Sequence, residues 1–328
     1  MAAIDFLSLC REIRASDGNI MILTHMNPDP DTIGSALGLK AVLAALNKTA
    51  FVVCDTPVSQ RMQGYFNICE NIDEDSLPPA SEISKVICVD IAARTMLGKF
   101  AESRADIVID HHYTNTGYGD LTYLDDTASA TGEIIAQLAE ALEVPLTADI
   151  AVPLYCAIAA DTGSFMFSNT TPRAFTIAAK LLSAGFDAAR LMRLMFQNKS
   201  LLQVSAERLA YNELRFFGNG KIAVISMTNE MKREHGIEGV EIEGLNNIPR
   251  TVEGVEVGAI IKESYPEDVT AEGTLYRVSL RSNEYVNVAE IAANFGGGGH
   301  PRAAGCKIRA KSIDEVQASL IELIGKAL

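Results

Sequence analysis

The first half of the chain alternates short apolar runs with amphipathic segments, and this alternation is what most restricts its fold. Four runs have the length and β-branched content of buried strands, namely residues 19–24, 50–54, 85–90 and 105–110. Helical patterns lie between and after these runs, at residues 32–46, 130–142, 147–160 and 172–184. Such alternation is typical of a mainly parallel sheet flanked by helices. We therefore predict an α/β fold for this half.

The pattern changes after residue 218. Alternating strands are predicted at residues 221–227, 255–263, 274–282 and 305–310, and helices at 288–295 and 312–324. Residues 187–217 are more charged and mostly helical in pattern. We predict a catalytic α/β domain over residues 1–186, a helical connector over 187–217 and a smaller α/β domain over 218–328.

Composition excludes several classes of protein. The 48% apolar and 21% charged residues are typical of a globular protein. The longest apolar stretch, residues 150–160, is about half as long as a membrane-spanning helix, and the start of the chain lacks the pattern of a signal peptide. The six cysteines show no C-x-x-C spacing. We therefore expect buried thiols in a reducing cytoplasm, without a zinc site, disulfides or a membrane partner.

The net charge of −14 is unevenly distributed. Residues 1–185 carry 11 Lys and Arg against 23 Asp and Glu, whereas residues 186–328 carry 17 against 19. Binding along a nucleic acid duplex requires basic surface, so long duplex DNA is not expected as a substrate. The acidic half suits carboxylates that hold cations, and a short anionic substrate could be held by local basic contacts from the second half.

Side chains that can bind a metal follow three of the four predicted strands. His25, Asp29 and Asp31 follow the first, Asp90 the third, and Asp110, His111 and His112 the fourth. The carboxyl ends of parallel strands open onto one crevice, so these side chains should meet there. Asp161 follows an apolar helix, at the end where the helix dipole disfavours a carboxylate unless a cation is near.

Each of these acids also has a simpler interpretation. Asp29 could cap the helix that follows it, with Gly34 and Gly38 letting that helix pack closely on the sheet. Asp90 could cap a turn, and Asp161 could be an ordinary loop acid. However, three of the five histidines in the chain lie at the same strand ends. The joint pattern therefore favours a cation site.

Oxygen and imidazole ligands without thiolates indicate Mn²⁺ or Mg²⁺, with Fe²⁺ or Co²⁺ as alternatives, rather than structural zinc. Four aspartates and at least two histidines are too many for one ion. They suffice for two ions about 3.5–4 Å apart that share a carboxylate. Such pairs activate a water and stabilise the oxygens of an in-line displacement at phosphorus.

In their order along the chain, "HMNPDPD", "VD", "DHH" and "ADTGSF" resemble the motifs of the DHH phosphoesterase superfamily. In the second half, "VSLRSN" (278–283) and "FGGGGHPRAAG" (295–305) are similar to motifs of the DHH-associated C-terminal domain. The compact length and "DTGSFMFSNTTPRAF" resemble the RecJ-like branch of oligoribonucleases, or nanoRNases, that also dephosphorylate pAp. The resemblance covers nearly the whole chain and implies an active site in the cleft between the two domains.

The resemblance also implies roles for individual residues. One metal would be held by His25 and Asp29, the other by Asp31, His111 and Asp161, with Asp90 bridging both and His112 facing the scissile phosphate. On physical grounds, Asp110 is either a carboxylate that fixes a histidine tautomer or a turn residue. The family often has an arginine where this chain has Met166, so a substrate contact from that position is in doubt. Arg173 is expected on a helix surface.

The glycine run in the second half could cradle an anion with its backbone N–H groups, or be a flexible loop. The substrate-binding residues predicted from the resemblance are Gly297, Gly298, Gly299, His300, Arg302 and Arg281. Arg281 would bind a phosphate through two parallel hydrogen bonds.

We therefore predict a two-metal phosphoesterase that hydrolyses short oligoribonucleotides to mononucleotides, with pAp as a second substrate. The expected cofactors are two Mn²⁺ ions, with Mg²⁺ or Co²⁺ as alternatives, and the expected partners are short single-stranded RNA or DNA oligonucleotides or nucleotides. The rival functions are hydrolysis of a cyclic dinucleotide or pGpG, hydrolysis of pyrophosphate, and nucleotide sensing without catalysis. The sequence identifies no interface, although a homodimer is common at this size.

Overall fold

The structure is a computed structural model that describes residues 2–237, 244–264, 270–271 and 273–328, and of His300 the backbone alone. The residues contact one another mainly within two compact units, Met1–Asn198 and Lys199–Leu328. Residues 187–217, predicted to be mostly helical, form α7 (Ala188–Met192), the π-helical turn η4 (Arg193–Gln197), α8 (Leu201–Asn212) and strand β7 (Leu214–Phe217). The division into a catalytic domain, a connector and a substrate domain stays a prediction.

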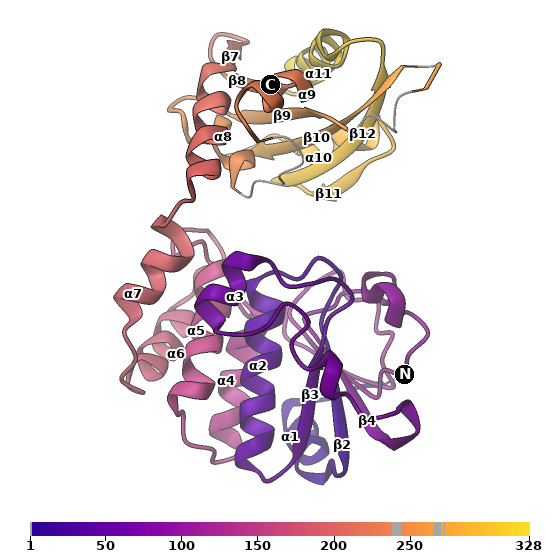
Figure 1. Cartoon of the computed structure of the whole chain (residues 1–328), viewed down its shortest axis with the longest axis vertical. Helices are drawn as coiled ribbons and strands as arrows, with labels where there is room; N and C mark the ends of the chain where they lie inside the picture. The colour runs from indigo at the N-terminus through magenta and orange to yellow at the C-terminus, as the bar shows by residue number, and fades with distance from the viewer. Residues whose placement is uncertain (1, 238–243, 265–269, 272) are drawn as a thin grey trace. The chain divides into compact units, whose positions relative to one another are not determined.

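A six-stranded parallel sheet forms the centre of the first unit (Figure 1). Its strands are β1 (Ala2–Ala3), β2 (Asn19–Leu23), β3 (Thr49–Val53), β4 (Ile83–Val89), β5 (Ile107–Asp110) and β6 (Leu121–Leu124). Their order across the sheet is β1-β6-β5-β4-β2-β3, and every neighbouring pair is parallel. The chain thus moves outward from β2 to β3 and then crosses back to β4. This reversal makes the gap between β2 and β4 the topological switch point of the sheet.

The two faces of this sheet are covered differently. One face packs against helices, which Figure 1 shows beside β2 to β4, and they contribute most of the larger apolar core. These helices are α1 (Phe6–Ala15), α2 (Pro30–Ala45), α4 (Thr131–Ala141), α5 (Ala148–Asp161) and α6 (Pro172–Leu182). The other face packs against loops and short helical turns, among them η3 (Arg94–Phe100). The remaining short elements are α3 (Gln60–Phe66), η1 (Glu74–Ser76) and η2 (Ala80–Glu82).

The glycines of α2 face a helix rather than the sheet, which corrects the prediction for Gly34 and Gly38. A Cβ at Gly34 would lie 2.3 Å from the carbonyl oxygen of Pro153, and one at Gly38 would lie 2.3 Å from Cδ2 of Leu154. Both of these neighbours belong to α5. The glycines therefore let α2 and α5 pack closely side by side.

The second unit contains a mixed six-stranded sheet in the order β11-β12-β10-β9-β8-β7, in which only the β8–β9 pair is parallel. Its further strands are β8 (Ile222–Met227), β9 (Val257–Glu263), β10 (Thr274–Ser282), β11 (Gly298–His300) and β12 (Ala303–Ala310). Helices α10 (Val288–Ala293) and α11 (Ile313–Ala327) share one core with the sheet, and α8 shares another. The short elements α9 (Asn229–Glu234), η5 (Leu245–Asn247) and η6 (Pro249–Thr251) complete the unit.

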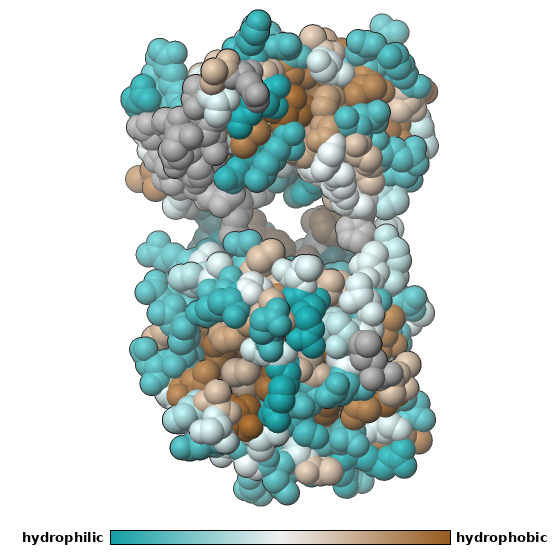
Figure 2. All heavy atoms as spheres, turned by 90° about the vertical axis from the view of Figure 1, so that its right-hand side faces the viewer, coloured by the Kyte–Doolittle hydropathy of each residue, from teal (hydrophilic) through white to brown (hydrophobic). Residues whose placement is uncertain are grey.

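The predicted fold class, a mainly parallel sheet flanked by helices together with a smaller α/β unit, is confirmed. The face drawn in Figure 2 is mostly hydrophilic, with apolar patches between the polar side chains. Among the residues that the structure describes, no helix is long and apolar enough to cross a membrane.

Candidate metal centre

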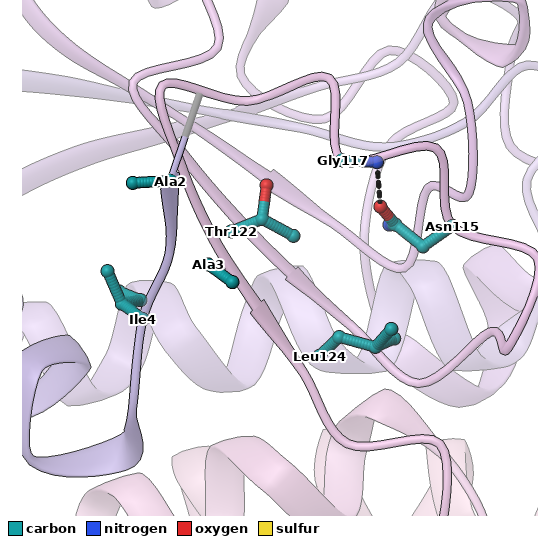
Figure 3. Close-up of a pocket in the computed structure, with 7 residues that line it drawn as sticks. All are labelled: Ala2, Ala3, Ile4, Asn115, Gly117, Thr122 and Leu124. Atoms are coloured by element: carbon teal, nitrogen blue, oxygen red, sulfur yellow. Dashed lines mark hydrogen bonds between the residues drawn. The ribbon is translucent and has the colours of Figure 1, made fainter.

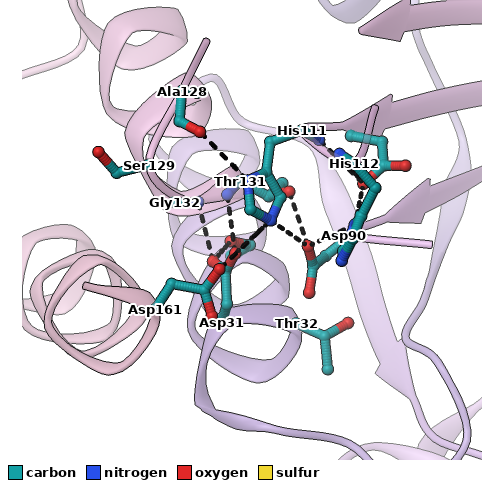
Figure 4. A network of polar contacts seen from close by, with 12 residues as sticks. Asp31, Thr32, Asp90, His111, His112, Ala128, Ser129, Thr131, Gly132 and Asp161 are labelled. Carbon is teal, nitrogen blue, oxygen red and sulfur yellow. Dashed lines mark hydrogen bonds and ion pairs between the residues drawn. The ribbon is translucent and has the colours of Figure 1, made fainter. Parts of the chain in front are cut away.

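The candidate ligands of the first unit gather at the carboxyl ends of β2, β4 and β5, on both sides of the switch point. His25 follows β2, Asp90 directly follows β4, and His111 directly follows β5. Three groups have ligand atoms that all lie within 4.8 Å of one another, namely His25–Asp29–Asp90, Asp31–His111–Asp161 and Asp90–His111–His112. Figure 4 shows the side chains of the second and third groups pointing toward one another. The structure thus brings all six predicted ligands together, with Asp90 between the two sets.

The imidazole of His111 has a nitrogen whose surroundings favour a cation. Its Nδ1 lies 3.2 Å from the backbone oxygen of Ala128, which accepts a hydrogen bond only if Nδ1 carries the proton. A neutral ring then has a lone pair at Nε2. This nitrogen is buried without a hydrogen-bond partner. It lies 3.3 Å from Oδ2 of Asp161, 3.5 Å from Oδ1 of Asp90 and 3.7 Å from Oδ2 of Asp31. A lone pair directed at three carboxylates is stabilised if a cation binds among them.

His25 repeats this arrangement on the other side of Asp90. Its Nδ1 lies 3.0 Å from the backbone oxygen of Met26. Its Nε2 lies 3.6 Å from Oδ1 of Asp29 and 3.8 Å from Oδ2 of Asp90. Histidines that bind metals commonly donate their other N–H to a carbonyl in this way. Asp29 also caps α2, since its Oδ1 accepts hydrogen bonds from the N–H groups of Asp31 and Thr32, each at 3.0 Å. The capping and metal-site interpretations of this stretch are therefore compatible.

Asp31 is held by the first turn of α4. Its Oδ2 accepts a hydrogen bond from the N–H of Thr131 at 2.8 Å, and its Oδ1 accepts from the N–H of Gly132 at 3.0 Å and from the hydroxyl of Ser35 at 2.9 Å (Figure 4). The first N–H groups of a helix have no partner within the helix and carry partial positive charge. They therefore fix this buried carboxylate. A Cβ at Gly132 would lie 2.5 Å from the Cβ of Ala157 on α5. Glycine is therefore required where the start of α4 approaches α5.

Asp90 is one of two acids of the centre whose pKa is raised well above the ordinary value. Burial, followed by the charges of Asp31 and Asp29, raises its pKa well above the ordinary value. Its backbone is left-handed, with φ 61°, which aspartate tolerates better than most residues. The hydroxyl of Thr131 donates to its Oδ1 at 2.9 Å. A bound cation would offset the repulsion that makes this carboxylate difficult to ionise.

Asp110 lies beneath the histidines and is completely buried. Its Oδ1 accepts hydrogen bonds from the N–H of His111 at 2.9 Å and from Nδ1 of His112 at 2.8 Å. Burial opposes a charge on His112, but the hydrogen bond to Asp110 and the charges of Asp110, Asp31 and Asp29 together raise the pKa of the imidazole. This geometry matches the prediction that Asp110 fixes a histidine tautomer, and it leaves Nε2 of His112 on the side away from Asp110.

Asp161 is the last residue of α5, as its position after the apolar pattern indicated. Burial, followed by the charges of Asp31 and Asp29, raises its pKa well above the ordinary value. The side-chain amide of Asn169 donates to the backbone oxygens of Asp161 at 3.1 Å and Ser129 at 3.2 Å. Asn169 therefore connects the Asp161 segment to the segment that precedes α4.

Arg173 lies partly exposed on α6, as predicted, but it also pairs with a buried acid, which was not predicted. Its Nε donates to Oε1 of Glu133, whose side chain is completely buried in the first turn of α4. Its Nη1 lies 3.0 Å from Oδ2 of Asp125. The other carboxylate oxygen of Glu133 accepts a hydrogen bond from the N–H of Ser129 at 3.1 Å. This ion pair anchors α6 to the helix turn that holds Asp31.

A pocket of about 400 Å³ lies at the β1–β6 edge of the sheet, and Asn115 forms part of its wall (Figure 3). The Asn115 amide donates to Oδ2 of Asp110 at 2.6 Å, and its oxygen accepts from the N–H of Gly117 at 2.7 Å. One wall of this pocket is therefore joined by a single hydrogen bond to the carboxylate that orients His112.

No pattern in the sequence predicted the roles of Thr131, Gly132, Asn115 or the Glu133–Arg173 pair. A local signal existed only for Gly132, since a small residue at a helix start permits close approach. The hydroxyl and amide contacts depend on residues that are distant in sequence, so no pattern marks them.

In the second unit, the glycine run is partly a strand. Gly298–His300 form β11, which pairs with β12 in the register Gly298↔Gly305, Gly299↔Ala304 and His300↔Ala303. A Cβ at Gly297 would lie 2.2 Å from the carbonyl oxygen of Gly305. Glycine is therefore required at this position by the close approach to β12, and a role of the run in binding a substrate stays a prediction. Gly298, in contrast, has open space where a Cβ would be. The side chain of His300 lies outside the described part of the structure.

The two predicted arginines differ in their surroundings. Arg281, on β10, is half-buried. Burial, followed by the charge of the neighbouring Arg250, lowers the pKa of its guanidinium group. Arg302 is exposed between β11 and β12, and its Nη1 donates to the backbone oxygen of Val286 at 3.0 Å. Arg281 pairs with Ala303 of β12, which in turn pairs with His300. Arg281, Ala303 and His300 are therefore neighbours in one row across the sheet.

Comparison with known proteins agrees with this geometry. Residues 19–158 match the model of the DHH family, N-terminal domain, and residues 219–326 match the model of the DHHA1 domain. A bifunctional oligoribonuclease and PAP phosphatase, NrnA, from Thermus thermophilus is 32% identical over 96% of this chain and 92% of its own length. The chain belongs to the DHH family. The resemblance carried by its motifs is confirmed.

Two solved structures share the fold of this DHH-family protein. An exopolyphosphatase-related protein from Bacteroides fragilis has a TM-score of 0.87 and 22% identity, covering 98% of this chain and 96% of its own. RecJ from Thermus thermophilus, in complex with Mn²⁺, has a TM-score of 0.51 and 15% identity, covering 98% of this chain and 54% of its own.

Proposed function

We propose that this protein is a phosphoesterase that uses two divalent cations to hydrolyse short oligoribonucleotides to mononucleotides, and pAp to AMP and phosphate. The observation that carries the proposal is the pair of ligand groups that meet at Asp90, each with the lone pair of one imidazole directed at carboxylates. The names of full-length relatives such as the Thermus NrnA support the choice of substrate.

Each side chain has a role in this proposal. His25 and Asp29 would hold one cation, Asp31, His111 and Asp161 would hold the other, and Asp90 would be shared by the two sites. The donors are oxygens and imidazole nitrogens, which favours Mn²⁺ and also suits Mg²⁺ or Co²⁺. When bound, such a pair supplies Lewis acidity and lowers the pKa of the attacking water.

The other residues orient the centre and the substrate. Thr131 and the first N–H groups of α4 fix Asp90 and Asp31, so these acids need not rearrange when the substrate binds. His112, held by Asp110, presents Nε2 to an oxygen of the scissile phosphate or to the leaving group. In the second unit, Arg281, beside Arg250, would bind a further phosphate of the substrate, and the other residues proposed to contact the substrate there are Gly297, Gly298, Gly299, His300 and Arg302.

The proposed partners are short single-stranded RNA or DNA oligonucleotides or nucleotides, and not long duplexes. A net charge of −14 opposes extensive contact with a polyanion. All six cysteines are free thiols, which supports a reducing, cytoplasmic location.

The test is product analysis with an RNA trinucleotide and pAp as parallel substrates, Mn²⁺ present, and a chelator control. We expect mononucleotides from the RNA and AMP from pAp, both lost with the chelator. Asp90→Ala should abolish both reactions and remain folded, whereas Asp75→Ala, which changes an exposed acid, should react normally.

The outcomes separate the parts of the proposal. Undiminished turnover by Asp90→Ala would contradict the two-cation centre. Cleavage of only pyrophosphate or a cyclic dinucleotide would retain the centre and overturn the choice of substrate. Absence of hydrolysis with any divalent cation would favour nucleotide sensing.

A further inference from the structure

Two segments that carry candidate ligands expose a large apolar side chain directly after a histidine. Met26 follows His25 and is 40% exposed, and Tyr113 follows His112 and is 63% exposed. A third such segment follows Asp161. An exposed apolar patch on a protein surface commonly marks a binding site.

The loop after Asp161 exposes the most apolar surface. Met166 is 79% exposed and Phe167 is 42% exposed. The residues before them, Gly163, Ser164 and Phe165, have consecutive positive φ values of 56°, 61° and 64°. Such a backbone is unfavourable for serine and phenylalanine, and strain of this kind is concentrated at functional sites.

Hydrogen bonds fix this loop beside the metal centre. The N–H groups of Met166 and Phe167 both donate to the backbone oxygen of Thr162 at 2.9 Å. Asn169, beyond the loop, donates to the backbone oxygen of Asp161 at 3.1 Å. The loop thus folds back onto Thr162 at one point and onto Asp161 at another, so the backbones of Met166 and Phe167 lie one residue from a candidate ligand.

The Phe167 ring has a defined position within this loop. It covers Gly163, where a Cβ would lie 2.4 Å from its Cζ. An aromatic ring held in place presents a flat face at low cost in conformational entropy. It is therefore suited to stack on another flat group.

The chemistry of these side chains selects the ligand. The side chains of Tyr113, Met166 and Phe167 are aromatic or apolar, so they offer no cationic group to a phosphate. An aromatic and apolar surface beside a centre that binds phosphate fits the flat base of a nucleotide.

We infer that Tyr113, Met166 and Phe167 form a stacking surface for the nucleobase next to the scissile phosphate. This inference rests on the proposed function, because it requires a nucleotide at the metal centre. It adds a determinant of specificity within the first unit, independent of the phosphate contacts assigned to Arg281.

The first test measures the activity of the Phe167→Ala variant on two substrates, namely a diribonucleotide and the same diribonucleotide with one base removed. We expect kcat/KM for the intact dinucleotide to fall about 5- to 160-fold, the range for replacing an aromatic side chain that stacks on a base with alanine. For the substrate that lacks the base at the stacked position, the fall should be less than twofold. Phe167→Tyr, which keeps the ring, should retain most of the activity on the intact dinucleotide.

A control variant and the unmodified protein distinguish failure of the stacking surface from failure of the proposed function. Phe216→Ala changes a phenylalanine of similar exposure on β7, and it should leave kcat/KM unchanged for both substrates. Equal losses on both substrates, or no loss on either, would overturn the stacking surface. Failure of the unmodified protein to cleave either substrate would instead overturn the proposed function.

A binding measurement gives an independent answer. The chain contains no tryptophan, so Phe167→Trp introduces a single fluorophore at the proposed surface. With Mg²⁺ present, AMP should quench its fluorescence saturably, whereas ribose 5-phosphate, which lacks a base, should not. If AMP inhibits hydrolysis by this variant but leaves its fluorescence unchanged at the same concentrations, the base lies elsewhere and the inference is wrong.

Discussion

Replacing Arg173 with methionine should destabilise the first unit far more than its partial exposure suggests. Glu133 is completely buried, and without Arg173 its charge keeps only the hydrogen bond from the N–H of Ser129. Removing one partner of a buried ion pair costs about 3–5 kcal/mol. Because the Arg173 side chain is 36% exposed and water can enter, we expect the lower end of that range, about 3 kcal/mol.

This free energy converts to a measurable change in the unfolding temperature. For a unit the size of Met1–Asn198, 1 kcal/mol corresponds to about 2–4 °C. The midpoint of the first unit should therefore fall by about 6–12 °C for Arg173→Met. Differential scanning calorimetry at a fixed Mn²⁺ concentration would measure it, and a second series with chelator would separate the effect of the ion pair from that of the cations.

The same helix supplies a matched control. Lys180 pairs with Glu140 at 2.7 Å, but both side chains are exposed, so Lys180→Met should cost less than about 1 kcal/mol. The double variant Arg173→Met/Glu133→Gln should recover much of the loss, because it no longer buries an unpaired charge. A loss for Arg173→Met no greater than that for Lys180→Met would refute the reasoning, as would a double variant that shows the sum of the single losses.

Two further predictions follow from the site and the core. Thr131→Val removes the hydroxyl that donates to Asp90 and should weaken Mn²⁺ binding about 10- to 100-fold in calorimetric titration, and an affinity within twofold of the unmodified protein would contradict it. Of the six thiols, only Cys69 should react rapidly with a disulfide reagent at pH 8, because the others are buried. Burial also raises the pKa of Cys54 to about 11 and that of Cys88 to about 12, so both of these thiols stay protonated at that pH. Rapid reaction of a second thiol, or rapid reaction of the Cys69→Ser variant protein, would be inconsistent with the burial of the other five thiols.

The elements found from the sequence are those with long, regular hydrophobic periodicity. The pattern at residues 32–46 became α2, Pro30–Ala45, and the run at 19–24 became β2, Asn19–Leu23. The short strands β1 and β6 were not predicted, because two to four residues carry too little periodicity. Helix α1 was also missed, although Asp5 caps it by accepting a hydrogen bond from the N–H of Ser8.

The metal centre was predictable in outline because parallel strands end at one edge of their sheet. This rule alone brings His25, Asp90 and His111 together. It gives no information on the contacts that hold these groups. The hydrogen bonds from Thr131 and Gly132 to Asp31 depend on where α4 packs, which local patterns do not specify. In the glycine run, composition did not reveal that Gly297 approaches a neighbouring strand.

The contact between Asp31 and the start of α4 also constrains how the protein is made. It joins residues 100 and 101 positions apart, and the last candidate ligand, Asp161, is 136 positions after the first, His25. At about 5–20 residues per second, a ribosome needs about 5–20 s to progress from Asp31 to α4. During that interval the early acids of the nascent chain have neither the helix N-terminus nor the later ligands beside them. The emerging polypeptide should therefore acquire its cations only after α5, which ends at Asp161 of 328 residues, has left the ribosome, so that metal loading cannot begin in the first third of synthesis.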